Sequence, residues 1–199
     1  TGACPAGDVG WGVRAEGFEL ETAMNPSDNL RVTAGFTHSQ TKYRNDLVGS
    51  ASGSPLDPAL RILPGKAMSN APENVVTYSV GWTPDLGSSG LSALFYVDGR
   101  TSTDYNTGSD LFPQKIQDGF TIINARVGIR GDNSKWSLEF WVQNLFEVDY
   151  AQVAFNTPFQ AGTTSAPFND ANNFPAGRQI FSQFLGEPRT FGATVRMKF

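Results

Sequence analysis

The chain has 199 residues, a formal net charge of −4 and 17% charged residues. It is long enough for one domain with a sizeable core, and it lacks the strongly basic balance that is typical of nucleic-acid-binding proteins. Hydrophobic residues make up 39% of the sequence, and no run approaches the ~18 apolar residues that a membrane-spanning helix needs. A spanning β-strand faces lipid with only every second residue, so these values remain compatible with a membrane β-protein.

The first half of the chain contains three segments in which apolar and polar residues alternate. Phe18 and Leu20 alternate with glutamates, and a strong turn signal at residues 25–29 separates them from a second segment, 30–37. The third segment, 74–82, carries aromatic or β-branched residues at every second position from 76 onward. This period of two predicts β-strands with one apolar face.

The second half repeats the same pattern in four further segments. They cover residues 91–98, 123–130, 136–143 and 191–199. Alternation repeated about seven times is incompatible with the 3.6-residue period of a helix. The sequence therefore predicts an all-β chain of about seven strands.

The connections between these segments alternate between short and long. The short ones cover roughly residues 25–29, 84–90 and 131–135, and the long ones roughly 45–70, 106–118 and 145–187. In an up-and-down meander, all short turns then lie at one end and all long loops at the other. Transmembrane barrels have this asymmetry, whereas a soluble sandwich has no reason to sort its loops in this way.

The two predicted strand faces differ sharply in polarity. Charged residues on the polar face include Arg126, Arg130, Glu139, Arg196 and Lys198, which would line a wet lumen. The apolar face would meet lipid through Val127, Ile129, Leu138, Phe140 and Val195. A sheet in a bilayer must close on itself so that its backbone groups are paired, and single-chain bacterial barrels have even strand numbers.

We therefore expect an antiparallel, up-and-down transmembrane β-barrel that is partial, with upstream strands missing. Residues 1–12 would be a truncated extracellular loop, and residues 13–199 the C-terminal part of the barrel. Aromatic residues near both predicted strand ends suggest interfacial girdles, although aromatics also simply suit strands. They are Trp82, Trp136 and Phe199 at the turn side, and Tyr43, Tyr105 and Tyr150 at the loop side.

Three segments resemble the TonB-dependent outer-membrane receptors. Residues 187–199 resemble the last strand of that family, residues 142–150 look like its "NLF…Y" segment, and residues 63–74 are similar to its loop leading into a strand. The residues that carry the first two motifs are Asn144, Leu145, Phe146, Tyr150, Pro188 and Arg189.

This resemblance implies a plugged barrel of about 22 strands in the bacterial outer membrane. It also implies uptake of a scarce small molecule, namely a ferric siderophore, a cobalamin or an oligosaccharide. The TonB complex would supply energy through an N-terminal region that is missing here. The barrel-assembly machinery would recognise the last strand, through Phe191, Val195, Met197 and Phe199.

The last long loop is rich in phenylalanine and asparagine, which can stack on and hydrogen-bond to sugars or flat chelates. Its candidate ligand-facing residues are Phe155, Phe159, Asn172, Asn173 and Phe174. The alternative is that these residues pack the loop against itself or the barrel wall. Arg44 and Arg61 are further candidates for contact with an anionic ligand, although solvated loop charges are more common.

Nothing in the sequence indicates catalysis, a cofactor or a metal site. His38 is the only histidine, and no HExxH, CxxC, calcium-loop or P-loop pattern is present. Cys4 is either a free thiol or half of a disulfide with an upstream partner. A passive porin and a soluble β-sandwich binding module remain alternatives to the receptor.

Overall fold

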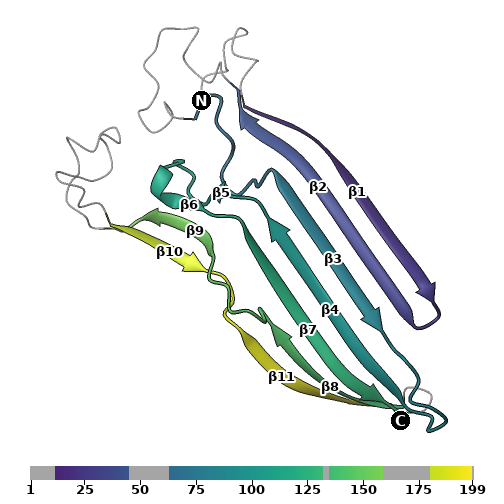
Figure 1. Cartoon of the computed structure of the whole chain (residues 1–199). Coiled ribbons are helices and arrows are strands. Elements are labelled where there is room, and N and C mark those ends of the chain that lie inside the picture. The colour runs from purple at the N-terminus through teal and green to yellow at the C-terminus, as the bar shows by residue number, and fades with distance from the viewer. Residues whose placement is uncertain (1–11, 45–62, 132–134, 159–179, 199) are drawn as a thin grey trace, which may run out of the picture.

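The computed structural model describes residues 12–44, 63–131, 135–158 and 180–198. Its main elements are long strands joined by turns and two small hairpins (Figure 1). The elements are β1 (Val13–Ser27), β2 (Leu30–Tyr43), β3 (Asn74–Trp82), β4 (Ser92–Ser102), β5 (Tyr105–Asn106), the 3₁₀ helix η3 (Pro113–Lys115), β6 (Ile116–Gln117), β7 (Phe120–Arg130), β8 (Trp136–Gln143), β9 (Ala151–Asn156), β10 (Phe181–Leu185) and β11 (Thr190–Met197). Within the described residues, no helix is long and apolar enough to cross a membrane.

Seven strands form one antiparallel sheet in the order β1-β2-β3-β4-β7-β8-β11. Each strand pairs with the next of the seven along the chain, which is the up-and-down order that the alternation predicted. The seven predicted segments are all present, although β1 is 15 residues long where the alternation marked only residues 18–22. In the described sheet β1 and β11 are the two edges, so the barrel is not closed.

The connections sort to opposite ends of this sheet, as Figure 1 shows. The short connections β1–β2, β3–β4 and β7–β8 lie at one end, which we call the turn side. At the other end, the loop side, the β4–β7 connection contains the hairpin β5–β6, and the β8–β11 connection contains β9–β10. These hairpins were missed in the sequence because β5 and β6 have only two residues each, and β9 and β10 do not alternate strictly between apolar and polar residues.

Strand register aligns the alternating residues into rows that cross the whole sheet. One row runs through apolar residues of all seven strands: Met24, Val32, Val80, Val97, Ala125, Val142 and Phe191. The row one residue further along lies on the opposite face and is polar: Thr33, Ser79, Asp98 and Asn124. A slip of one residue in any pair would interchange the two faces.

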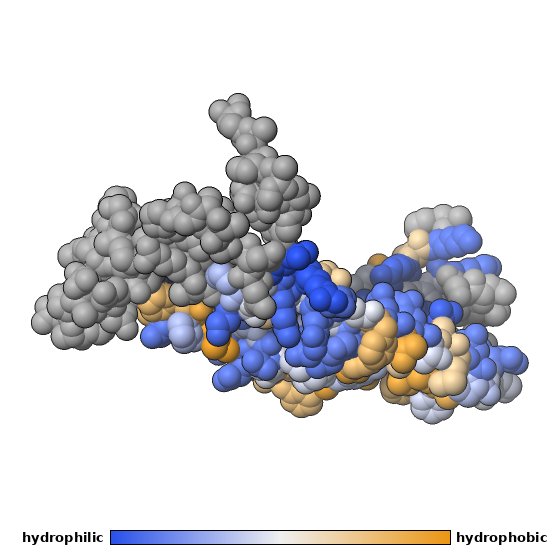
Figure 2. Space-filling model, turned by 90° about the horizontal axis from the view of Figure 1, so that it is seen from above, coloured by the Kyte–Doolittle hydropathy of each residue, from blue (hydrophilic) through white to orange (hydrophobic). Residues whose placement is uncertain are grey.

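Within the described residues, no second layer covers the apolar face of the sheet. Phe95 is 43%, Phe140 55% and Phe191 80% exposed, and Figure 2 shows hydrophobic and hydrophilic residues gathered on opposite sides of the sheet. A soluble sandwich would bury this face against a second sheet. An uncovered apolar face of this extent instead matches a surface that lipid covers.

Aromatic residues mark both ends of the long strands. At the turn side, Trp82 stacks on Phe95 with ring centroids 5.4 Å apart, and Trp136 begins β8. Tyr43 ends β2 at the loop side. This is the placement that headgroup-level aromatic belts take in membrane proteins.

We predict that an arginine at Val97, in the middle of the apolar row, destabilises the folded barrel in lipid by about 2–4 kcal/mol, because the charge must enter the hydrocarbon region. The matched change is Ser79→Arg, which adds the same side chain to the polar face, where Ser79 borders a hollow of about 400 Å³. Urea unfolding in lipid bilayers measures both. Equal costs would show that the two faces are assigned wrongly.

Candidate functional site

The polar face of the sheet is a wall of hydrogen-bonded rungs. The Thr33 and Ser79 hydroxyls are 2.7 Å apart, and the Asn124 side-chain amide donates to Asp98 over 2.8 Å. Such groups remain hydrated or paired without cost. This face can therefore line a water-filled lumen but cannot face hydrocarbon.

Towards the turn side, this wall carries one buried carboxylate among three arginines. Glu139 is only 2% exposed and lies 2.8 Å from Arg196, 3.3 Å from Arg126 and 3.8 Å from Arg130. The Ser137 hydroxyl also donates to the carboxylate over 3.3 Å. The arginines come from the two strands that flank β8, namely β7 and β11.

Glycines on those flanking strands make room for this cluster. Gly128 lies directly across from Glu139, and a Cβ there would be 2.5 Å from the Leu138 carbonyl oxygen and 3.0 Å from Glu139 Cγ. Gly192 lies across from Trp141, whose ring occupies the space that a side chain would need. The Trp141 indole N–H donates to the Thr194 hydroxyl over 3.2 Å. The side chains of Glu139 and Trp141 can therefore both lie flat on the wall.

At the loop end of β8, Asn144 holds a tight turn together. Its φ is +49°, a left-handed conformation that asparagine tolerates better than most residues. Its side-chain amide donates to the carbonyls of Val148 and Glu187 over 2.9 and 3.0 Å, and its side-chain oxygen accepts from the Val148 N–H over 2.8 Å. Asn144 therefore ties the end of β8 to the segment that enters β11.

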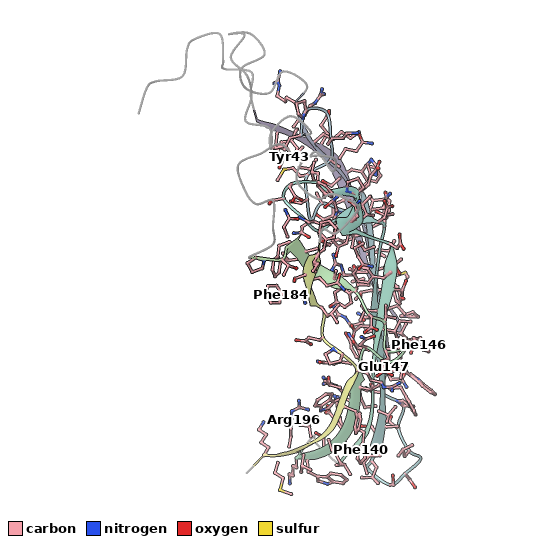
Figure 3. All side chains as sticks on the ribbon, turned by 90° about the vertical axis from the view of Figure 1, so that its left-hand side faces the viewer. Tyr43, Phe140, Phe146, Glu147, Phe184 and Arg196 are labelled. Carbon is pink, nitrogen blue, oxygen red and sulfur yellow. The ribbon has the colours of Figure 1, made fainter. Side chains whose placement is uncertain are left out.

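The other motif residues surround this turn. The Leu145 N–H donates to the Ile123 carbonyl over 2.8 Å, and Arg189, next to Pro188, donates to Glu147 over 2.6 Å. Phe146 is 66% exposed and projects from the ribbon beside Glu147 (Figure 3). The residues of the two family-like segments around this turn thus form one structural unit, at the point where β8 leaves the sheet and β11 enters it.

Beyond this turn, the two loop-side hairpins pack on each other and form a small core. Phe112 contacts Phe181 with ring centroids 5.7 Å apart, and the Ala154 N–H donates to the Thr107 carbonyl over 3.4 Å. Lys115 is 4% exposed because it pairs with Asp110 at 2.5 Å. These contacts give the loop side a defined shape in the described residues.

An aromatic group connects this core to the sheet. Phe120 at the start of β7 stacks on Tyr150 with ring centroids 4.5 Å apart, and Tyr105 lies 6.4 Å from Phe120. Burial raises the pKa of Tyr105 above its ordinary value, so its hydroxyl stays protonated at neutral pH and remains a hydrogen-bond donor. Tyr150 of the family motif therefore has a packing partner.

Two surfaces on the loop side are open to a ligand. Phe155 and Phe184 of the β9–β10 hairpin contact each other at 5.4 Å, and Phe184 is 64% exposed and points away from the sheet in Figure 3. A cavity of about 680 Å³ lies between residues 66–73 and 104–116, lined by both charged and apolar side chains.

The residues predicted from the sequence to contact a ligand or the assembly machinery lie in different parts of the structure. Phe155 is on the open aromatic surface, and Phe191, Val195 and Met197 are on the apolar face of β11, each more than half exposed. Arg44 directly follows β2, and its backbone N–H donates to the Gly12 carbonyl over 3.0 Å. The remaining candidates lie outside the described residues: Cys4, Arg61, Phe159, Asn172, Asn173, Phe174 and Phe199. His38 bonds to Asn74 over 2.9 Å, and the described residues contain no group of metal-binding side chains.

Comparison with known proteins decides the family. The profile described as "TonB dependent receptor-like, beta-barrel" matches residues 9–145, which is more than half of the chain. This chain belongs to the TonB-dependent receptor β-barrel family. Members of that family are receptors and transporters rather than enzymes.

The relatives of this receptor barrel are similar over nearly all of the chain. It is 26% identical over 191 residues to the ferric-pyoverdine M114 receptor PbuA of Pseudomonas sp. (strain M114), covering 94% of this chain but 18% of that protein. The ferric yersiniabactin uptake receptor FyuA from Yersinia pestis has the same fold, with a TM-score of 0.69, 15% identity, and coverage of 95% and 24% of the two chains. The ferric-catecholate import receptor Fiu from E. coli K12 has a TM-score of 0.60 and 18% identity, and the match covers 95% of this chain and 21% of that chain.

We predict that Asn144→Ala lowers the free energy of unfolding by about 2–4 kcal/mol, because it removes the side-chain partner of three part-buried backbone groups and places alanine at a positive φ. Asn144→Gly retains the conformation without strain, so its smaller cost isolates the hydrogen bonds. The exposed Phe146→Ala is the control, with an expected cost of about 0.5 kcal/mol or less. A wild-type urea midpoint for Asn144→Ala would contradict this role.

Proposed function

We propose that this chain is the C-terminal part of the barrel of an outer-membrane receptor that takes up a ferric siderophore with TonB-dependent energy coupling. The observation that carries the proposal is the family match together with a sheet whose uncovered face is apolar and whose opposite face is polar. A sheet of this kind suits a wall between lipid and a wet lumen.

The names of the relatives favour a ferric siderophore over the other ligands of this class. The three proteins compared above are named for ferric pyoverdine, ferric yersiniabactin and ferric catecholates. The loop-side surface supports the same class, because the rings of Phe155 and Phe184 offer apolar faces to a flat chelate. No comparison reported above points to cobalamin or an oligosaccharide.

The proposal assigns a partner to each surface of the chain. Outer-membrane lipid would cover the apolar face, including Phe191, Val195 and Met197 of β11. The barrel-assembly machinery would recognise that same strand through its alternating pattern and Phe199. The TonB complex would act through a region of the receptor outside these 199 residues, and we assign no nucleic-acid partner because the chain is acidic overall.

The uptake proposal is tested with the complete receptor in a strain that lacks its own siderophore receptors. Iron-55 uptake is measured with ferric pyoverdine-, phenolate- and catecholate-type siderophores, in cells with and without TonB. We expect uptake of one class, abolished without TonB, because transport against a gradient requires energy. Uptake that persists without TonB would indicate a passive porin instead.

A substitution within this chain locates the ligand surface in the same assay. Phe184→Ala should raise the half-saturating siderophore concentration by about tenfold, as loss of one aromatic contact of roughly 1.5 kcal/mol predicts. Phe146→Ala is the matched control, because its ring is equally exposed but lies at the β8 turn. Equal effects of the two changes would remove the β9–β10 hairpin from the ligand site.

The proposed assembly role of the last strand has its own test. Deletion of Phe199 from the complete receptor should lower its abundance in the outer membrane, because the terminal aromatic completes the alternating apolar pattern of that strand. Surface labelling of intact cells, normalised to total synthesis, measures the loss. Deletion of a residue from the β1–β2 turn provides a comparison for general misfolding. Unchanged surface abundance after deletion of Phe199 would contradict the assembly role.

A further inference from the structure

The polar wall has an excess of positive charge at one place that packing does not explain. Around Glu139, three guanidinium groups share a single carboxylate, so the cluster carries two uncompensated positive charges. Like charges held this close repel each other, and one carboxylate cannot neutralise three. Such a group is stable only where water or a further anion compensates the excess.

The arginines also keep hydrogen-bond donors that Glu139 does not use. A guanidinium has five N–H donors, whereas Arg126 and Arg196 each approach the carboxylate most closely through one nitrogen, and Arg130, at 3.8 Å, is too far to donate to it. Their side chains are 42%, 37% and 58% exposed for Arg126, Arg130 and Arg196. Spare donors from two strands therefore face the open side of the wall.

One of these donors is buried without a partner. Arg126 Nε is enclosed and has no acceptor in the part of the chain that the structure describes. A buried unpaired donor destabilises the folded state, so an acceptor at this position is favoured. A small hollow of about 90 Å³ is lined by Arg126, Tyr96, Asp98 and Trp141, among others. The Asp98 carboxylate in this hollow accepts from the Asn124 amide over 2.8 Å.

We propose that Arg126, Arg130 and Arg196 form an oxyanion-binding site on the lumen wall, in which Glu139 is the positioning residue. The buried carboxylate holds the three guanidinium groups together, and Gly128 and Gly192 allow it and Trp141 to lie flat beneath them. The ligand is a carboxylate or phosphate, because these groups match the planar fork of arginine. Arg196, at β11, completes the site from the last strand.

This oxyanion comes either from a soluble anion or from a carboxylate side chain of another segment of the same polypeptide. The inference relies on the proposed function only in placing this face towards a lumen. Its test needs no siderophore and no transport, so its failure would leave the uptake result unaffected.

The experiment uses the complete receptor, purified in detergent. Inorganic phosphate is titrated by calorimetry at constant ionic strength, with chloride as the reference salt. Hydrogen exchange of the whole chain is compared between the wild type, Arg196→Gln, Arg126→Gln, and Arg189→Gln. Arg189 is the control because it is a similarly exposed arginine paired with one glutamate, and heat-modifiable migration verifies that each variant is folded.

For a soluble anion, we expect phosphate to bind the wild type and to bind Arg196→Gln about tenfold more weakly, as loss of a charge-assisted hydrogen bond predicts. Arg126→Gln should weaken it likewise, and Arg189→Gln should not. For a carboxylate of the same polypeptide, the wild type should not bind phosphate, and Arg196→Gln and Arg126→Gln should increase exchange in one segment outside β7, β8 and β11. If phosphate does not bind and exchange changes only in those three strands, the site does not exist.

Discussion

The structure depends on the pairing of backbone N–H and C=O groups between neighbouring strands of the seven-stranded sheet. In hydrocarbon an unpaired peptide group costs several kcal/mol, so in the proposed outer-membrane barrel the strands must remain in register over their whole length. The seven-residue apolar row from Met24 to Phe191 is the result of that register. Once pairing determines the row, each side chain lies on either the apolar face or the polar face of the sheet.

This constraint does not extend to the loop side, where water can satisfy the backbone. Beyond Ser102 and Asn144 the chain leaves the sheet to form the β5–β6 and β9–β10 hairpins. Those hairpins need a different source of stability, which they find in a small conventional core around Phe112 and Ala154. The two parts of the sheet are thus packed differently: the long strands keep an exposed apolar face, which we propose lipid covers, and side chains cover the short strands.

Sequence periodicity predicted the first kind of packing and missed the second. The seven long strands could be recognised because each repeats its pattern over several residues, and the connection lengths then determined which ends they share. The hairpins could not be recognised, because a two-residue strand such as Tyr105–Asn106 has no period. The arginines and Glu139 were correctly placed on the polar face, yet their convergence depends on the register of three strands, which alternation within one strand does not specify.

The residues of the two family-like segments are explained by contacts between positions that are far apart in the sequence. Asn144 and Arg189 are separated by more than forty positions, and each is unremarkable within its own segment. In the fold, Asn144 bonds to the carbonyl of Glu187, and Arg189 pairs with Glu147. Both bonds join the segment just after β8, where the chain departs for the β9–β10 hairpin, to the segment just before β11, where it returns. Because they do so, β8 and β11 pair over their full length, although a long excursion separates them in the chain.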